Sequence, residues 1–257
     1  MDGSILGLIR QFLKSGIMIG EDWQESILGS PQGGVISPLL ANIYLDEFDQ
    51  EMMKRKHRIV RYADDILIFY TSKKGADNAL KVASHILEVT LKLKVNERKT
   101  HIAHSDTGIK FLGVAIFTNY TAIQEKKLKT LKVKVRQLTK RNGGVNLATV
   151  LKQLNPVLRG FVNYFKIANI TSKLKSLSAW IRRRLRAVQM RLWNQAGRLH
   201  RRLKQLKYKP LFKSIKMNSW RNSASPLASY AMSNQWFKSI GLYSIDEVKT
   251  GVLASFY

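Results

Sequence analysis

Two adjacent carboxylates, those of Asp64 and Asp65, lie between two short apolar segments of this 257-residue chain. The flanking segments 59–60 and 66–69 favour strands, and an Asp-Asp pair favours the turn that joins them. Carboxylates this close repel each other by roughly 1 kcal/mol in bulk water, a cost that a divalent cation would remove. Oxygen ligands suit Mg²⁺ or Mn²⁺, which also bind water and substrate phosphates. The pair therefore predicts a metal site for phosphoryl chemistry on a β-hairpin, and a plain Asp-Asp turn is the alternative.

A loop rich in glycine and proline precedes the Asp pair. Its centre, residues 31–34, reads Pro-Gln-Gly-Gly, and its two glycines would let a ligand approach the backbone closely. The residues that follow predict a helix from Pro38 to about residue 56, with Ser37 as its N-cap, because proline is favoured in the first turn of a helix. The loop and the helix would therefore stand immediately before the hairpin.

The loop, its helix and the Tyr-Ala-Asp-Asp segment at 62–65, taken in this order, resemble the palm of reverse transcriptases of the group II intron type. Three later segments resemble the same family. Asn96–Thr100 is similar to the palm segment after the catalytic hairpin, and Phe111–Val114 is similar to the primer-grip strand. Leu158–Phe165 is similar to the signature of the maturase, or thumb, domain. Each segment alone is also compatible with a loop, a core strand or a core helix.

The resemblance implies an α+β fold. Residues 1–117 would form a partial polymerase palm, with a catalytic β-hairpin and helices, and residues 118–257 would form an all-α, basic thumb/maturase (X) domain. The implied reaction is RNA-directed DNA synthesis, in which deoxynucleoside triphosphates extend a DNA primer on an RNA template. Asp64 and Asp65 would be the catalytic metal ligands, holding Mg²⁺ or Mn²⁺. The residues expected to contact the nucleotide or the template are Pro31, Gln32, Gly33, Gly34 and Lys99, and Gly113 would support the primer end.

One departure from the family pattern concerns its first catalytic aspartate, which lies on a strand upstream of the glycine-rich loop. Residues 1–14 already resemble the helix just before that loop, so this strand and the fingers are expected to be missing. Asp46 and Asp49 are poor substitutes, as are Asp2 and Asp22, because none lies in an apolar strand segment. We therefore expect a poor polymerase when the chain acts alone, and a fingers-palm segment supplied in trans would be its partner.

The charge of the chain is concentrated in its second half. The whole sequence carries 44 Lys and Arg against 17 Asp and Glu, whereas residues 121–220 alone carry 26 Lys and Arg and a single acid, Glu125. Such an excess predicts RNA binding with a steep salt dependence, and a solvated charged face is the alternative. The arginines expected to contact intron RNA are Arg182, Arg183, Arg184, Arg186, Arg191, Arg198, Arg201 and Arg202. Trp180 and Trp193 are expected to pack in the core rather than to stack on bases.

Helical periodicity organises this basic half. Apolar residues recur at intervals of three, four or seven between residues 173 and 209, which predicts one apolar stripe, and Gly197 is expected to break or bend that helix. Residues 147–167 predict another helix, which Pro156 would kink or start late. The segment Thr118–Ala122 is expected to be a short polar link.

A second hypothesis is a non-catalytic splicing factor that binds and stabilises intron RNA. A basic peripheral membrane protein fits less well, because the apolar stripe is narrow. The sequence has no cysteine, which excludes disulfides and Cys-ligated zinc. It has no apolar run near the roughly 18 residues of a membrane span, and its N-terminus does not resemble a signal peptide. We therefore expect a cytoplasmic protein without a membrane partner.

Overall fold

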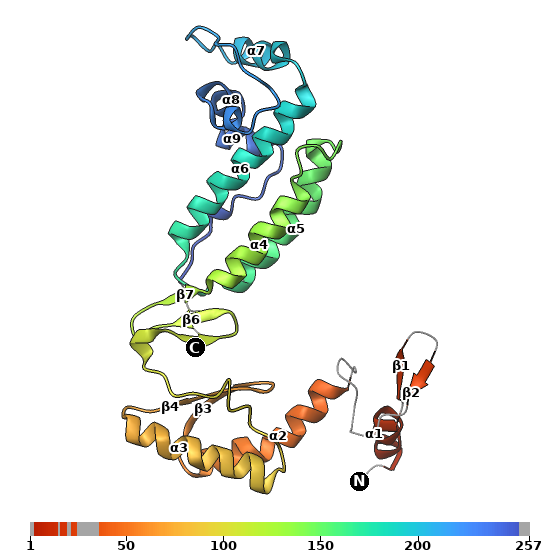
Figure 1. Ribbon diagram of the computed structural model, residues 1–257, viewed down its shortest axis with the longest axis vertical. Coiled ribbons are helices and arrows are strands. Elements are labelled where there is room, and N and C mark those ends of the chain that lie inside the picture. Colours follow the sequence, from red (N-terminus) through yellow and green to blue (C-terminus); the bar gives the residue numbers. More distant parts are fainter. Residues whose placement is uncertain (1–2, 15, 20–21, 25–35, 252–257) are drawn as a thin grey trace. The chain divides into compact units, whose positions relative to one another are not determined.

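The chain forms two compact units, Met1–Ile102 and Ala103–Tyr257. The computed structural model describes residues 3–14, 16–19, 22–24 and 36–251, and Figure 1 shows the elements of each unit. Helices and small antiparallel sheets occur together in the described residues. The predicted α+β class is thus confirmed at this level.

The first unit contains helices and two β-hairpins. Its elements are α1 (Gly3–Lys14), β1 (Ile17–Ile19), β2 (Asp22–Gln24), α2 (Ser37–Lys54), β3 (Arg58–Tyr62), β4 (Asp65–Phe69), α3 (Lys73–His85) and the π-helical turn η1 (Ile86–Thr90). Helix α2 begins with Pro38 in its first turn, as the sequence predicts, but Ile36 rather than Ser37 is the N-cap residue. The helix thus starts one residue earlier than expected.

The hairpin of β3 and β4 packs on α2 through one of its two faces. Residues of a strand alternate between faces, and the register pairs Ile59 with Ile68 and Arg61 with Ile66. These isoleucines pack against a buried cluster. The members of that cluster are Leu45, Phe48, Met52, Ala83, Ile86 and Leu91. The opposite face, which carries Tyr62, is open to solvent, with 64% of Tyr62 exposed.

The second unit begins with a small sheet and continues as a helical bundle. Its elements are η2 (Ser105–Thr107), β5 (Ile109–Phe111), β6 (Val114–Ile116), β7 (Thr121–Ile123), α4 (Glu125–Leu138), α5 (Leu147–Phe165), α6 (Thr171–Trp193), α7 (Ala196–Gln205), η3 (Arg221–Ala224), α8 (Pro226–Ala231), α9 (Asn234–Ser239) and η4 (Ile245–Glu247). Strand β7 pairs with β6 and lies where the sequence suggested a polar link. The segment therefore completes a three-stranded sheet instead of only connecting two elements.

The effects expected of Gly197 and Pro156 on the helices differ from what the structure shows. The basic helix α6 ends at Trp193, and its C-cap Asn194 has φ +61°, a region that asparagine tolerates better than most residues. The break therefore precedes Gly197, which lies within α7. Helix α5 begins at Leu147, where its N-cap Asn146 accepts a hydrogen bond from the backbone N–H of Thr149 at 2.8 Å. Pro156 lies inside the helix and does not delay its start.

One large apolar core holds the second unit together. Helices α4, α5 and α6 contribute most of it, and α4 and α6 each contact α5 (Figure 1). Residues from the last forty positions complete it, because Leu227, Phe237 and Ile245 are at most 6% exposed and belong to the same cluster. Within the described part of the chain, no helix is both long enough and apolar enough to cross a lipid bilayer.

Candidate functional site

The Asp pair lies at the tip of the hairpin that β3 and β4 form. Tyr62 faces Asp65 in the register, so Ala63 and Asp64 are the two turn residues. Ala63 has φ +52°, and the left-handed region costs an L-residue about 1–2 kcal/mol. Both carboxylates are exposed. Asp65 shares the open face of the hairpin with Tyr62, whereas Asp64 belongs to the turn itself, so the two side chains are not equivalent.

A neighbouring arginine, which sequence reasoning missed, fixes this turn to helix α2. The guanidinium of Arg61 donates to both carboxylate oxygens of Asp49, with Nε 2.9 Å from each and Nη2 2.6 Å from Oδ2. Its Nη1 donates to Asn42 at 2.9 Å and to the carbonyl of Ala63 at 3.1 Å. The same side chain therefore binds α2 and the turn residue next to Asp64.

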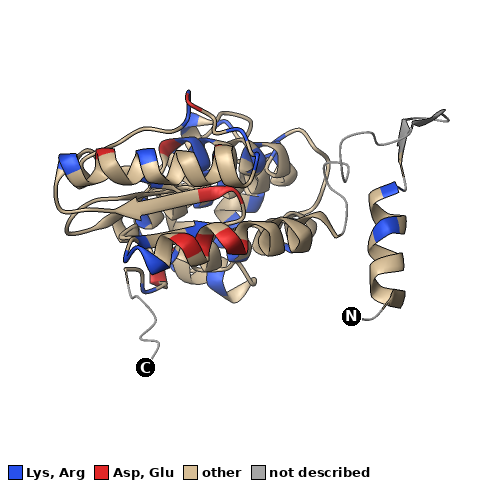
Figure 2. Cartoon of the chain, turned by 90° about the horizontal axis from the view of Figure 1, so that it is seen from below, with Lys and Arg blue, Asp and Glu red and all other residues tan. Residues whose placement is uncertain are grey.

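Burial makes this contact stronger than a surface ion pair. The Arg61 side chain is 11% exposed and that of Asp49 is 19% exposed. The hydrogen bonds that Arg61 donates to Asp49 raise the pKa of Arg61 and outweigh the opposing effect of burial. Residues 46–65 contain six Asp or Glu, and Figure 2 colours these residue types red along the chain. The Arg61 guanidinium thus pairs with a carboxylate of this acidic stretch and remains charged.

The oxygen donors at the hairpin tip fit a magnesium ion only in part. Adjacent carboxylates are the ligand type that Mg²⁺ prefers, and Mg²⁺ completes its shell with water and phosphate oxygens. However, no group of three or more His, Cys, Asp or Glu side chains that could hold a metal is found among residues 3–14, 16–19, 22–24 and 36–251. Asp64 and Asp65 would therefore supply two protein ligands, and further ligands would come from elsewhere.

The nucleotide-contacting residues expected from the sequence divide into two sets. Pro31, Gln32, Gly33 and Gly34 lie outside the described residues. Lys99 lies in an exposed turn, where its backbone N–H donates to the carbonyl of Asn96 at 3.0 Å. An exposed lysine in a short turn can reach a phosphate, and its contact with a nucleotide stays a prediction.

Gly113 occupies the turn between β5 and β6 in the second unit. Leu112 and Gly113 form a two-residue turn with φ +46° and +84°, the pattern of a hairpin turn in which glycine is favoured. Tyr164 of α5 donates its hydroxyl to the carbonyl of Leu112 at 3.0 Å, and the N–H of Gln124 donates to the carbonyl of Gly113 at 3.1 Å. The turn is fixed to the helices, and its role as a primer grip remains untested.

The eight arginines expected to bind RNA fall into structural and free groups. Arg182 pairs with Asp246 at 3.0 Å, and both side chains are mostly buried. Arg184 donates to Thr139 at 2.7 Å and stacks on Trp220 at 4.8 Å from the ring centroid. Arg186 donates to the carbonyl of Met232 at 3.0 Å.

These contacts change the charge balance of the helix. Burial lowers the pKa of Arg184 and of Arg186, and the nearby charges of Arg136 and Arg182 add to this effect for the two groups respectively. For Asp246, burial raises the pKa, but hydrogen bonds from Arg182 and Ser178 outweigh it and lower the pKa below its usual range. The three inward arginines therefore stabilise the bundle. The outward arginines, whose binding to RNA stays a prediction, are the exposed Arg183, Arg191, Arg198 and Arg201 and the partly exposed Arg202.

The two tryptophans of α6, Trp180 and Trp193, both pack partly buried against the core, as the sequence predicts. Trp180 is half-buried against the core, and the guanidinium groups of Arg136 and Arg184 lie 5.7 and 5.4 Å from its ring centroid. The indole is thus in a protein environment of charged and apolar groups.

Comparison with known proteins identifies the family of the chain. Residues 3–116 match the family described as reverse transcriptase (RNA-dependent DNA polymerase), and residues 128–208 match the maturase-specific domain of group II introns. The chain is 29% identical over 230 residues to the group II intron-encoded protein LtrA of Lactococcus lactis subsp. cremoris. It is 32% identical over 146 residues to protein YkfC of Escherichia coli K12.

A third relative is the putative COX1/OXI3 intron 2 protein of Saccharomyces cerevisiae, with 24% identity over 170 residues. The alignments cover 63%, 44% and 44% of this chain for LtrA, YkfC and the yeast protein respectively. They span 36%, 38% and 20% of the length of those proteins. The chain belongs to the group II intron reverse transcriptase/maturase family and contains its reverse transcriptase and maturase domains in that order.

Proposed function

We propose that this chain carries the catalytic hairpin and the basic thumb of an RNA-directed DNA polymerase that also binds its intron RNA. The observation that carries the proposal is the exposed Asp64–Asp65 turn, which Arg61 ties to α2 in a chain of this family. A partial palm at 1–117 and a thumb at 118–257 are part of the proposal. The first catalytic aspartate would come from a fingers-palm segment in trans.

The protein groups would act mainly by positioning. Bound at Asp64 and Asp65, Mg²⁺ would supply charge neutralisation for phosphoryl transfer. Arg61 holds the turn so that the two carboxylates keep their orientation, and the open face of the hairpin leaves both accessible. Lys99 and the Pro31–Gly34 loop would contact the nucleotide, and Gly113 the primer end. The outward arginines would neutralise phosphates of template and intron RNA.

A second function is favoured by a separate observation. Only two carboxylates meet at the hairpin tip in the described residues, whereas the basic second unit is stabilised by its own core. A splicing factor that binds intron RNA without polymerising DNA would need only that unit. The two functions differ in whether Asp64 matters.

Primer extension separates these functions. Extension of a DNA primer on an RNA template is measured with Mg²⁺, for the chain alone and with an added fingers-palm segment of a relative. We expect extension in the supplemented reaction. Asp64→Asn should lower the extension rate at least about a hundredfold, because removing one group that stabilises transition-state charge typically costs about that much in rate. Asp77→Asn, which changes an exposed aspartate of α3, is the matched control and should extend normally.

The result of the substitution decides between the two functions. Equal extension by Asp64→Asn and by the unchanged chain would refute the catalytic assignment. Salt-sensitive RNA binding without extension in any mixture would support the splicing factor instead.

A further inference from the structure

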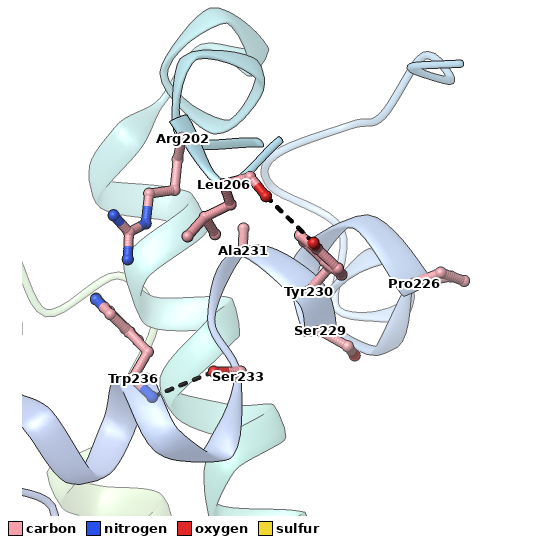
Figure 3. A pocket seen from close by; sticks show the side chains of 8 residues that line it. All are labelled: Arg202, Leu206, Pro226, Ser229, Tyr230, Ala231, Ser233 and Trp236. Carbon is pink, nitrogen blue, oxygen red and sulfur yellow. Dashed lines mark hydrogen bonds between the residues drawn. The ribbon is translucent and has the colours of Figure 1, made fainter. Parts of the chain in front are cut away.

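A pocket of about 530 Å³ lies between α7 and the short helices α8 and α9. Figure 3 shows the side chains that surround it. They are Arg202, Leu206, Pro226, Ser229, Tyr230, Ala231, Ser233 and Trp236. The volume is within the range of sites that enclose a small ligand, and the lining combines aromatic, cationic and hydroxyl groups. None of the site residues expected from the sequence other than Arg202 contributes to it.

Hydrogen bonds fix the walls of this pocket in the free protein. Tyr230 of α8 donates its hydroxyl to the carbonyl of Leu206, at the end of α7, at 3.2 Å. Ser233 accepts a hydrogen bond from the backbone N–H of Trp236 at 3.2 Å and so caps α9. Arg186 of α6 binds the carbonyl of Met232 between the two helices. Little ordering would therefore be needed when a ligand enters.

Two side chains in the pocket are available for a ligand. Figure 3 shows the guanidinium of Arg202 and the indole of Trp236 pointing toward one another from α7 and α9. The interactions found among the described residues include no hydrogen bond, ion pair or cation–π contact of the Arg202 guanidinium. Arg184 and Arg186, by contrast, are both bound and stacked. Trp236 packs in part on the core and meets Phe237 edge-on, at 5.0 Å and 66°, and it also lines the pocket.

We propose that this pocket binds one unpaired nucleotide of a nucleic-acid single strand. The base would stack on Trp236, and its phosphate would bind the guanidinium fork of Arg202. The proposal rests on the proposed function in assuming that the second unit binds nucleic acid. It adds a binding site for an unpaired base to the sequence-independent contacts of the outward arginines.

The charge around the pocket favours this ligand over an uncharged one. Residues 196–209, which include α7, contain six Lys or Arg and no acid, and residues 226–239 contain Lys238 and no acid. A polyanion would therefore be attracted to both walls. An acidic peptide would share that attraction and would pair with Arg202, but its carboxylates would not stack on the indole face. A nucleotide offers both a phosphate for Arg202 and a base for Trp236.

The test uses the whole chain and a single-stranded RNA of roughly ten nucleotides, a length typical of such sites, with 2-aminopurine at one position. Fluorescence reports stacking of that base, and anisotropy reports affinity. We expect Trp236→Ala to weaken binding about 5- to 150-fold and to abolish the fluorescence change, because one base stack contributes about 1–3 kcal/mol. Trp236→Phe keeps an aromatic ring and should restore part of both signals. Double-stranded RNA of the same length should bind Trp236→Ala and the unchanged chain equally.

Charge and stacking are separated by two further variants. Arg202→Gln should weaken binding, lower the salt slope by about one, and reduce the fluorescence change. Lys204→Gln removes one charge from the same helix outside the pocket, so it should lower the salt slope equally and leave the fluorescence change intact. A single-stranded DNA of the same sequence tests the sugar. Weaker but Trp236-dependent binding of DNA supports a pocket for unpaired nucleotides that prefers RNA.

Each remaining outcome is decisive. If Trp236→Ala binds single-stranded RNA as the unchanged chain does, and both retain a steep salt slope, the pocket proposal is overturned while RNA binding by the second unit stands. If the unchanged chain binds no RNA, both proposals fail together. Polyglutamate binding that is lost in Arg202→Gln, with single-stranded RNA binding unchanged in Arg202→Gln and Trp236→Ala, would assign the pocket to acidic peptides and overturn the nucleotide.

Discussion

The Nη2 nitrogen of Arg61 lies 2.6 Å from the Oδ2 oxygen of Asp49, while its Nη1 nitrogen binds the carbonyl of Ala63. One guanidinium therefore couples a helix to the turn of a hairpin through its fork of donors. A lysine has no such fork, because its ammonium is a single point charge on a flexible stem. The orientation of the Asp64–Asp65 turn thus depends on the shape of this side chain as well as on its charge.

We expect Arg61→Lys to lower the free energy of unfolding by about 1–3 kcal/mol, since it loses the bidentate contact and keeps the charge. Arg61→Ala should cost more, because it leaves the partly buried Asp49 carboxylate without its partner. Urea unfolding measures both effects. Hydrogen exchange tests whether Arg61 positions the turn. In both variants the amides of 63–65 should exchange faster than in the unchanged chain, and this increase should exceed that in the rest of the hairpin. Uniform acceleration over the whole unit would indicate only a general loss of stability.

The turn conformation of Ala63 makes a second prediction. Valine at this position is expected to destabilise the hairpin by roughly 1–2 kcal/mol, because a β-branched side chain is strained at positive φ. Ala63→Gly should be neutral or slightly stabilising, because glycine adopts this φ freely but loses more entropy on folding. Thermal or urea unfolding of the two variants gives the comparison. Equal stability of Ala63→Val and the unchanged chain would contradict the turn geometry.

The buried pair of Arg182 and Asp246 predicts an acid-dependent loss of stability in the second unit. The pKa of Asp246 is lower in the folded than in the unfolded chain. Its contribution is therefore complete above the unfolded pKa of about 3.9 and is lost as the pH falls through the folded pKa. Unfolding free energies measured from pH 6 down to about 3 should fall less steeply in Asp246→Asn, which cannot titrate. Parallel pH profiles of the two proteins would contradict the assignment.

Adjacent arginines on α6 give a matched pair of substitutions. Arg184→Gln should destabilise the second unit by about 1–3 kcal/mol, because it removes the contacts with Thr139 and with the Trp220 ring. Arg183 is exposed, so Arg183→Gln should change stability by less than about 0.5 kcal/mol. Its effect should instead be a smaller salt slope of RNA binding. The unfolding free energy and the salt slope of RNA binding are measured on both variants. A loss of stability in Arg183→Gln, with only a smaller salt slope in Arg184→Gln, would contradict the assignment.

The sequence predicted the elements whose signals are local. The hairpin, the helix α5 and the apolar stripe of α6 follow from short runs and a repeat of three or four. The role of Arg61 could not be foreseen, because Asp49 is twelve residues away and only the packing of the hairpin on α2 brings them together. Strand alternation alone places Arg61 on the face occupied by isoleucines, but it does not identify Asp49 as the partner.

Long-range contacts also explain the arginines. Position along a helix does not reveal that Asp246 lies opposite Arg182, sixty-four residues earlier in the chain. The break after α6 was misplaced at Gly197 for a different reason. Glycine disfavours helices by about 1 kcal/mol, but it is tolerated in the first turn of a new one, and an asparagine able to adopt positive φ ended the old one.

The segment that follows α7 has a practical consequence for anyone who trims this protein. The match to the maturase-specific domain stops at residue 208, yet Leu227, Phe237 and Ile245 lie in the interior of the same bundle. A clone cut at the end of that match would leave the inner side of α6 facing water and would lose the acid partner of Arg182. Such a shortened protein is expected to aggregate on expression, and a boundary beyond residue 248 is the sound choice for producing the second unit.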